Sequence, residues 1–234
     1  HVDLELVFGQ LPNLTRLDLT YGVRQIGMKY ERSLFGMKIS DATSLAKCVK
    51  GTAVLTMLSL PCNLMDDDLL RMLMTGLITN NTVTHLDVSH NKITNHGARL
   101  LAKLLGPRSV LTSLDLCDNA VHAEGGRYLG RALRRNDSLV DLNLRLNRLT
   151  DEGGRMLFEG IKDNGSLAVL NVSSNSLAAE SARSFAACLR APGCSLAAVD
   201  LSCNELAPED GEEIRTALQQ QAQAGGGSLT SLDL

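Results

Sequence analysis

Two adjacent segments decide the fold, LTSLDLCDN (111–119) and LVDLNLRLN (139–147). Each carries leucine at its first, fourth and sixth positions and asparagine at its ninth, and the two begin 28 residues apart. This alternation places the leucines on one face of a short β-strand. The pattern, with other aliphatic residues at some leucine positions, begins at Leu14, Leu55, Val83, Leu111, Leu139, Leu167, Leu196 and Leu229.

The spacing of these starts identifies a repeat. Four consecutive steps from Leu55 to Leu167 are 28 residues each, a period within the range of roughly 20–29 that is typical of leucine-rich repeats. The second half of each unit has apolar residues at helical spacing, such as Leu129 and Leu133. We therefore expect an α/β leucine-rich-repeat solenoid. It should be a ribonuclease-inhibitor-like horseshoe, with parallel strands on the concave face and helices on the convex face.

The ninth-position asparagine has a structural explanation. It lies where the chain leaves the strand, and its amide can bond backbone groups of the neighbouring repeat that no strand ladder satisfies. We expect a structural role for the whole column, which consists of Asn63, Asn91, Asn119, Asn147, Asn175 and Asn204.

Composition and charge limit the function classes. Leucine supplies 43 of the 234 residues and aromatic residues only 3%, so one aliphatic residue builds the core. The formal net charge of −3 disfavours a nucleic-acid partner. No apolar run approaches the roughly 18 residues of a membrane span, so no membrane partner is expected. The six cysteines show no zinc spacing, and we expect them to be reduced and buried.

We expect one leucine-rich-repeat domain over 1–234, part of a longer chain, because repeat arrays need covers at both ends. One segment breaks its period. The step from Leu14 to Leu55 is 41 residues, and the extra residues fall in YGVRQIGMKYERSLFG (21–36). This inserted loop carries Tyr21, Tyr30 and Phe35. Inserted loops often carry partner contacts, but this one could equally fold onto its own repeat as a partial cap.

A polar column between the leucines is a second candidate surface. Asp87, Asp115, Asn143 and Asn171 occupy the same strand position in successive repeats. Neighbouring strands lie about 4.8 Å apart, so these side chains should form a partly acidic ladder that could receive a basic segment. The alternative is that Asp and Asn are simply usual at this position of the fold.

Arginines are concentrated in two adjacent repeats, and residues 196–234 contain one basic residue against seven acidic ones. This asymmetry suits docking to charged partners, although a solvated helix face would explain it as well. The candidate contact residues are Arg127, Arg131, Arg134, Arg135, Arg145 and Arg148.

No catalytic or cofactor motif is recognisable. His85, Ser113 and Asp115 fall on adjacent predicted strands, but no nucleophile elbow or oxyanion hole accompanies them. His90 and His96 lack a recognisable metal-ligand spacing. We therefore expect no enzyme activity, no catalytic residue, no cofactor and no metal.

Three segments resemble one family, YGVRQIGM (21–28), LCDNAVHAEGGRYLGRAL (116–133) and LNLRLNRLTDEGG (142–154). They are similar to the leucine-rich-repeat subunit of the nexin–dynein regulatory complex, the t-complex-associated testis-expressed protein family. The similarity runs from about Leu11 to Gly165, and the inserted segment is its most telling part. The run Met65-Asp66-Asp67-Asp68 and the QQQAQAGGG stretch (219–227) depart from the family.

This resemblance implies a non-enzymatic scaffold of the ciliary or flagellar axoneme that helps regulate dynein-driven motility. Its partners would be other subunits of that complex, including coiled-coil subunits, and neighbouring axonemal proteins. Other readings of the same repeat class are a regulator of a small GTPase and a ligand-sensing or inhibitor domain, although ribonuclease inhibitors are much richer in cysteine.

Overall fold

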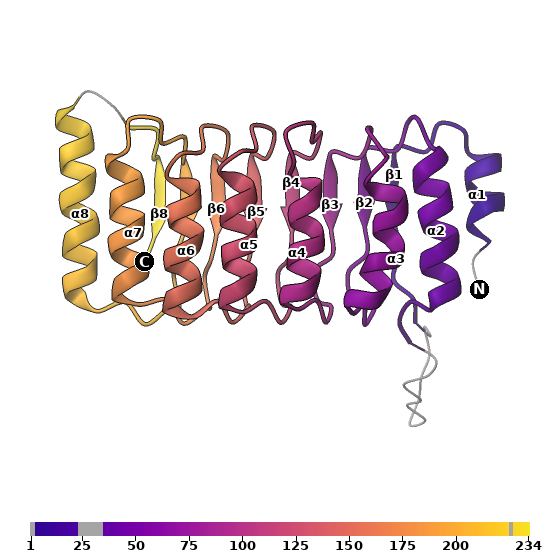
Figure 1. Ribbon diagram of the computed structural model, residues 1–234, viewed down its shortest axis with the longest axis horizontal. Coiled ribbons are helices and arrows are strands. Elements are labelled where there is room, and N and C mark those ends of the chain that lie inside the picture. Colours follow the sequence, from indigo (N-terminus) through magenta and orange to yellow (C-terminus); the bar gives the residue numbers. More distant parts are fainter. Residues whose placement is uncertain (1–2, 23–34, 225–226) are drawn as a thin grey trace.

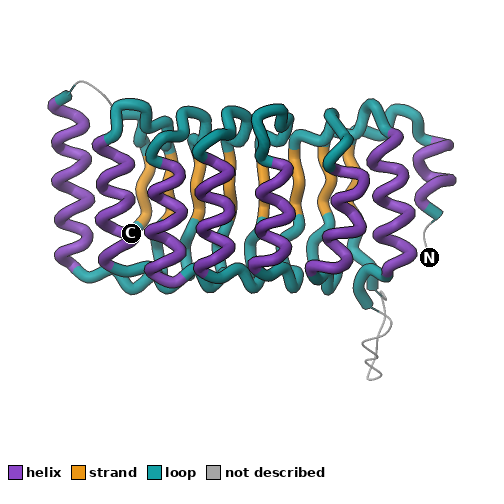
Figure 2. Tube along the Cα trace, in the orientation of Figure 1, coloured by secondary structure: helices purple, strands orange, loops and turns teal. Residues whose placement is uncertain are grey.

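The computed structural model describes residues 3–22, 35–224 and 227–234 and consists of two layers, a parallel sheet and a row of helices (Figures 1 and 2). Strands follow their chain order across the sheet. The strands are β1 (Arg16–Asp18), β2 (Met57–Ser59), β3 (His85–Asp87), β4 (Ser113–Asp115), β5 (Asp141–Asn143), β6 (Val169–Asn171), β7 (Ala198–Asp200) and β8 (Ser231–Asp233). The helices are α1 (Leu4–Gln10), α2 (Ile39–Gly51), α3 (Asp67–Leu77), α4 (Asn95–Leu104), α5 (Ala123–Leu133), α6 (Thr150–Ile161), α7 (Ala179–Arg190) and α8 (Pro208–Gln223).

The predicted solenoid is confirmed. Every strand begins two residues after the start of its sequence pattern, and a helix follows wherever the helical spacing predicted one. The short helix α1 was not predicted; Asp3 caps it by accepting the N–H of Leu6 at 3.0 Å. No helix in the described ranges is both long and apolar enough to cross a bilayer.

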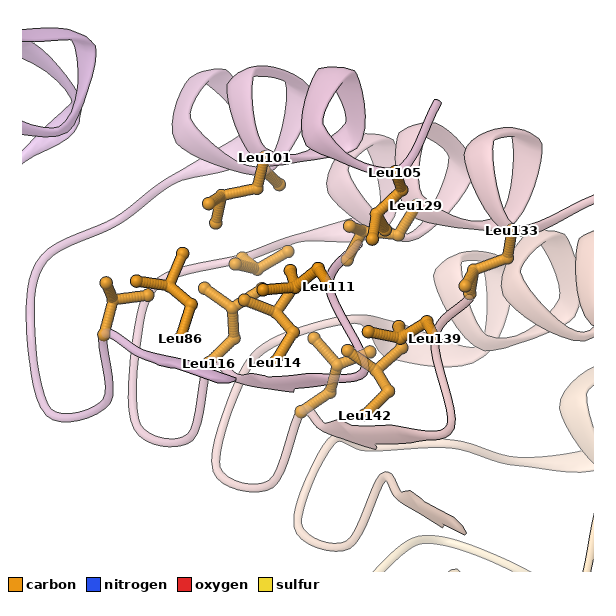
Figure 3. Packing of buried hydrophobic residues seen from close by; sticks show 14 of the residues in the cluster. Leu86, Leu101, Leu105, Leu111, Leu114, Leu116, Leu129, Leu133, Leu139 and Leu142 are labelled. Carbon is orange, nitrogen blue, oxygen red and sulfur yellow. The ribbon is translucent and has the colours of Figure 1, made fainter. Parts of the chain in front are cut away.

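Leucines from both layers form the core between sheet and helices (Figure 3). The middle residue of each strand points inward, and Leu86, Leu114 and Leu142 stand side by side in register. They meet Leu101 and Leu129 from the helices, and all five are at most 1% exposed. Burying a leucine contributes about 1.5–3 kcal/mol, so the stacked rows supply the core without many aromatic rings.

The asparagine column ties each repeat to the one before it, as predicted. Asn119 Nδ2 donates to the carbonyl of Val88 in the preceding repeat at 3.1 Å, while its Oδ1 accepts the N–H of Ile93 at 2.9 Å. Asn147 repeats both contacts with Leu116 and Val121. The column therefore satisfies backbone groups at the bends, where no strand ladder reaches.

Several helix starts are capped from the preceding repeat. Asp67 of α3 accepts the N–H groups of Thr94 and Gly97 at the start of α4, at 2.9 and 3.0 Å. Asp151 of α6 does the same for Ala178 and Ser181 at the start of α7. Partial burial acts to raise the pKa of Asp151, but these bonds hold that pKa below its ordinary value of 3.8. Each cap therefore belongs to a junction between two repeats.

Neighbouring helices approach most closely at small residues. A Cβ atom on Gly160 of α6 would lie 2.1 Å from the carbonyl oxygen of Gly130 in α5, far inside van der Waals contact. Gly126 and Gly153, which open the same two helices, also face each other closely. These glycines are needed because no side chain fits between the two backbones.

All six cysteines fall within the described residues, and none forms a disulfide. The expectation that all are buried is wrong, because Cys62 and Cys203 are exposed. Cys188 is the most deeply placed; its thiol donates to the carbonyl of Phe158 at 2.9 Å, and burial raises its pKa. Such a thiol is a poor nucleophile, because the thiolate is the reactive form.

Replacing Asn119 by leucine should lower the free energy of unfolding by about 2–4 kcal/mol, because buried backbone groups lose their partners. Urea denaturation followed by circular dichroism measures this. Asn81→Leu is the matched control, since Asn81 is exposed and should change stability by less than about 0.5 kcal/mol. Equal effects of the two substitutions would contradict the proposed role of the column.

Glycine-to-alanine substitutions should have opposite signs at two helical positions. Gly160→Ala should destabilise the protein by about 1–3 kcal/mol, because the new methyl group overlaps the α5 backbone. Gly211→Ala in α8 should stabilise it by up to about 1 kcal/mol, since nothing lies within 4 Å and alanine favours the helix. Thermal melts of both variants test the pair; stabilisation by both would show that the α5–α6 contact is not tight.

Candidate partner-binding surfaces

The predicted polar column lies on the face of the sheet opposite the helices, called the strand face below. It consists of the third residue of each strand, and the parallel register places Asp87, Asp115, Asn143 and Asn171 side by side. This arrangement follows from the alternation that sends the middle residue of each strand into the core. The remaining members of the column are Asp18, Ser59, Asp200 and Asp233.

The column also closes the strand ends. Asp87 accepts the N–H of Ser89 at 2.9 Å, and Asp115 accepts that of Cys117 at 2.8 Å, each two residues further along the chain. Lateral bonds join neighbours, as where Asn143 Nδ2 donates to Asp115 at 3.0 Å. These half-buried groups are therefore used within the fold, which supports the structural explanation of the column.

Two neighbouring carboxylates, Asp141 and Asp115, lie on the strand face. Asp141 is the first residue of β5 and lies beside Ser113 of β4. Burial, and then the charge of Asp115, raise its pKa above the ordinary value of 3.8. Burial also raises the pKa of Asp115. Our sequence prediction omitted Asp141, although it shares a face with Asn143 two residues later, a signal that strand alternation provides.

The two described aromatic residues of the inserted segment lie against the second repeat. The N–H of Tyr21 donates to Asn63 Oδ1 at 2.7 Å, and its carbonyl accepts the N–H of Gly36 at 2.9 Å. Its ring packs on the core, its hydroxyl finds no hydrogen-bond partner among the described residues, and burial together with Asp41 raises its pKa to about 12. Phe35 is half-buried, and Tyr30 lies outside the described residues.

The six arginines do not form a single patch. Arg134 and Arg135 follow the end of α5, whereas Arg145 and Arg148 follow β5 at the other end of the repeat. Arg127 pairs with Glu124, and Arg134 pairs with Asp163 at 2.9 Å. Arg127 also lies over the Tyr128 ring, 5.4 Å from its centroid. Arg131 and Arg135 are exposed and form no ion pair within the described ranges.

The histidines are engaged locally. His85 Nδ1 lies 2.8 Å from Thr84 Oγ1, and His90 Nδ1 lies 2.9 Å from Asp118 Oδ2. Within the described part of the chain, no cluster of three or more His, Cys, Asp or Glu side chains is placed to hold a metal ion.

Comparison with known proteins agrees with this geometry. The family model described as "Leucine Rich repeat" matches residues 79–102, 109–130 and 135–158. The chain is a leucine-rich-repeat solenoid. Its relatives include dynein regulatory complex subunit 5 of Mus musculus, 39% identical over 103 residues, which are 44% of this chain and 21% of that protein. The same subunit of Chlamydomonas reinhardtii is 47% identical over 73 residues, 31% of this chain and 19% of that protein.

The resemblance to the leucine-rich-repeat subunit of the nexin–dynein regulatory complex is thus confirmed. The chain spans about a fifth of the length of the curated relatives it matches. A solved structure titled leiomodin-1 actin-binding site 2 has a similar fold, with a TM-score of 0.54 and 16% identity over 81% of this solenoid and 93% of that chain. At that identity the likeness concerns the fold alone.

Neutralising Asp141 should stabilise the protein in a pH-dependent way. With a raised folded pKa, the ionised carboxylate is disfavoured by folding at neutral pH. The folded state takes up the proton first as pH falls, so this cost disappears. Asp141→Asn should therefore raise the urea midpoint at pH 7, and the gain should shrink as pH falls through the folded pKa. Asp137→Asn, at an exposed carboxylate, is the control. A gain that is equal at pH 7 and pH 4 would contradict the ionisation argument.

Proposed function

We propose that this chain is a non-enzymatic scaffold of the ciliary or flagellar axoneme, acting within the nexin–dynein regulatory complex and helping to regulate dynein-driven motility. The observation that carries the proposal is the identity of 39% and 47% to dynein regulatory complex subunit 5 from two organisms. A subunit of a complex binds other proteins, and a solenoid with extended surfaces on both layers is suited to that role.

The proposal gives the two layers separate tasks. The strand face offers the carboxylates Asp115 and Asp141, which suit a cationic segment of a partner. The helix layer offers the exposed cations Arg131 and Arg135, which suit an acidic one. Partners are other subunits of the complex, coiled-coil subunits among them, and neighbouring axonemal proteins. Long coiled coils carry charge along their length and can lie against an extended array.

Retention in the axoneme tests this proposal. A tagged version of the protein, expressed in ciliated cells that lack the endogenous copy, should remain with axonemes after membrane removal and a salt wash, and should restore the normal beat. Release with the soluble matrix would overturn the proposal.

One variant in the same assay locates a contact. Arg131→Glu combined with Arg135→Glu should weaken retention, because both side chains are exposed and unpaired within the described ranges. The circular dichroism melt of the purified variant should match the wild type, since exposed substitutions away from packed features change stability little. Full retention of the variant would remove the α5 surface from the proposal.

A further inference from the structure

The α3–α4 junction is built differently from the α2–α3, α5–α6 and α6–α7 junctions. In several helices, the residue that faces a carbonyl of the preceding helix, thirty residues earlier, is small. Gly76 of α3 faces the carbonyl of Ala46, where an added Cβ would lie 2.1 Å from the oxygen. Gly160 faces Gly130 in the same way, and the Cys188 thiol bonds the Phe158 carbonyl.

The corresponding residue of α4 is large. Leu104 lies 28 residues after Gly76 and 56 before Gly160, and Ala132 takes this place in α5. The Leu104 side chain packs on the core and occupies space that the other junctions give to backbone contact. Figure 1 shows α3 and α4 further apart than α2 and α3. We call this α3–α4 junction the wide joint.

The chain also turns differently beside the wide joint. An asparagine lies in the turn that follows each of α3, α5 and α6. Two of them, Asn80 and Asn164, each also donate to a carbonyl of the preceding repeat, at 2.8 and 2.7 Å. After α4 this position is Arg108, whose guanidinium only donates hydrogen bonds and cannot accept one from the backbone. Ser109 makes the corner instead, accepting the N–H of Leu111 at 3.2 Å. The bond across the corner is thus replaced by a long cationic side chain.

Together these changes open a pocket of about 270 Å³ between the ends of α3 and α4. Its apolar lining includes Leu77, Leu104, Val110 and Ile78, and the Ile78 side chain is 54% exposed. Lys103 and Arg108 supply its charges; no carboxylate lines it, and neither cation forms an ion pair within the described ranges. A cavity of about 150 Å³ holds a benzene molecule, so this volume admits one or two aliphatic side chains.

We propose that the wide joint binds an acidic peptide segment of a partner protein. An aliphatic side chain of that segment enters the pocket over Ile78 and Leu104, and flanking carboxylates pair with Lys103 and Arg108. The charges argue for this occupant, because two unpaired cations beside an apolar hollow attract carboxylates and repel a basic segment. Lys103, in the last turn of α4, also complements the helix dipole, but the dipole explains neither Arg108 nor the exposure of Ile78. This inference rests on the proposed scaffold function.

Peptide binding to the purified 234-residue chain tests the proposal. The probe is a fluorescent hexapeptide with two central leucines flanked on each side by two glutamates. One comparison peptide has lysines in place of the glutamates, and another has glycine and serine in place of the leucines. The acidic leucine peptide should bind saturably, shift the methyl NMR signals of Ile78 and Val110, and lose affinity as salt rises. Either comparison peptide should bind at least about tenfold more weakly.

Two matched charge reversals sharpen the result. Arg108→Glu should weaken binding of the acidic peptide by about tenfold or more. Lys162→Glu, an exposed cation at the end of α6 outside the pocket, should change it less than about twofold. Thermal melts confirm that both variants fold.

The proposal is overturned if the acidic peptide leaves the Ile78 and Val110 methyl signals unmoved up to millimolar concentration. Equal binding of the basic peptide, or an Arg108→Glu variant that binds like the wild type, also overturns it. Retention of the wild-type protein in axonemes is measured separately. A chain that is retained but fails these peptide tests refutes the pocket alone, whereas a chain that is released refutes the scaffold function.

Discussion

The asparagine that follows each strand from β2 to β7 is the constraint on which the rest of the molecule depends. A chain that leaves a three-residue strand and turns toward a helix exposes backbone donors and acceptors that neither element can satisfy. One buried amide serves both kinds of group, with its oxygen and nitrogen directed to the preceding repeat. This fixes the stacking distance on the strand side, so the leucine rows meet in register and helix spacing is left to the residues between the helices.

Helix spacing follows a different rule, based on side-chain size. Gly76 and Gly160 allow backbone contact, and caps such as Asp67 and Asp151 lock the helix starts to the preceding unit. Since the strand pairing is uniform, differences in helix spacing arise in the helix layer and its corners. The proposed peptide site lies where Leu104 departs from this rule, and the proposed strand-face contacts lie where charge, not spacing, varies.

The sequence predicted the solenoid, all eight strands and the role of Asn119, because those features repeat and a period can be counted. It did not predict the short α1, which stands outside the repeat. The apolar pattern does not distinguish Leu104 from the other leucines, so the pocket could not be predicted from it. The pocket is recognised only when α4 is compared with the neighbouring helices in space. Tyr21 was chosen as an aromatic in an insertion, yet its backbone holds Asn63, a contact 42 residues distant that composition does not encode. The arginines were grouped by sequence proximity, but a repeat that reverses direction separates Arg135 from Arg145.

The wide joint has a mechanical consequence. On the strand side, β3 and β4 remain fully paired across it, from His85 with Ser113 to Asp87 with Asp115. On the helix side, Leu104 replaces backbone contact with a side chain and an open pocket. Bending of the array should therefore be easiest at this junction, where the strands stay paired and the helices pack less tightly. The array thus divides at this junction into two segments, one ending at α3 and the other beginning at α4, that stay joined through the strand pair.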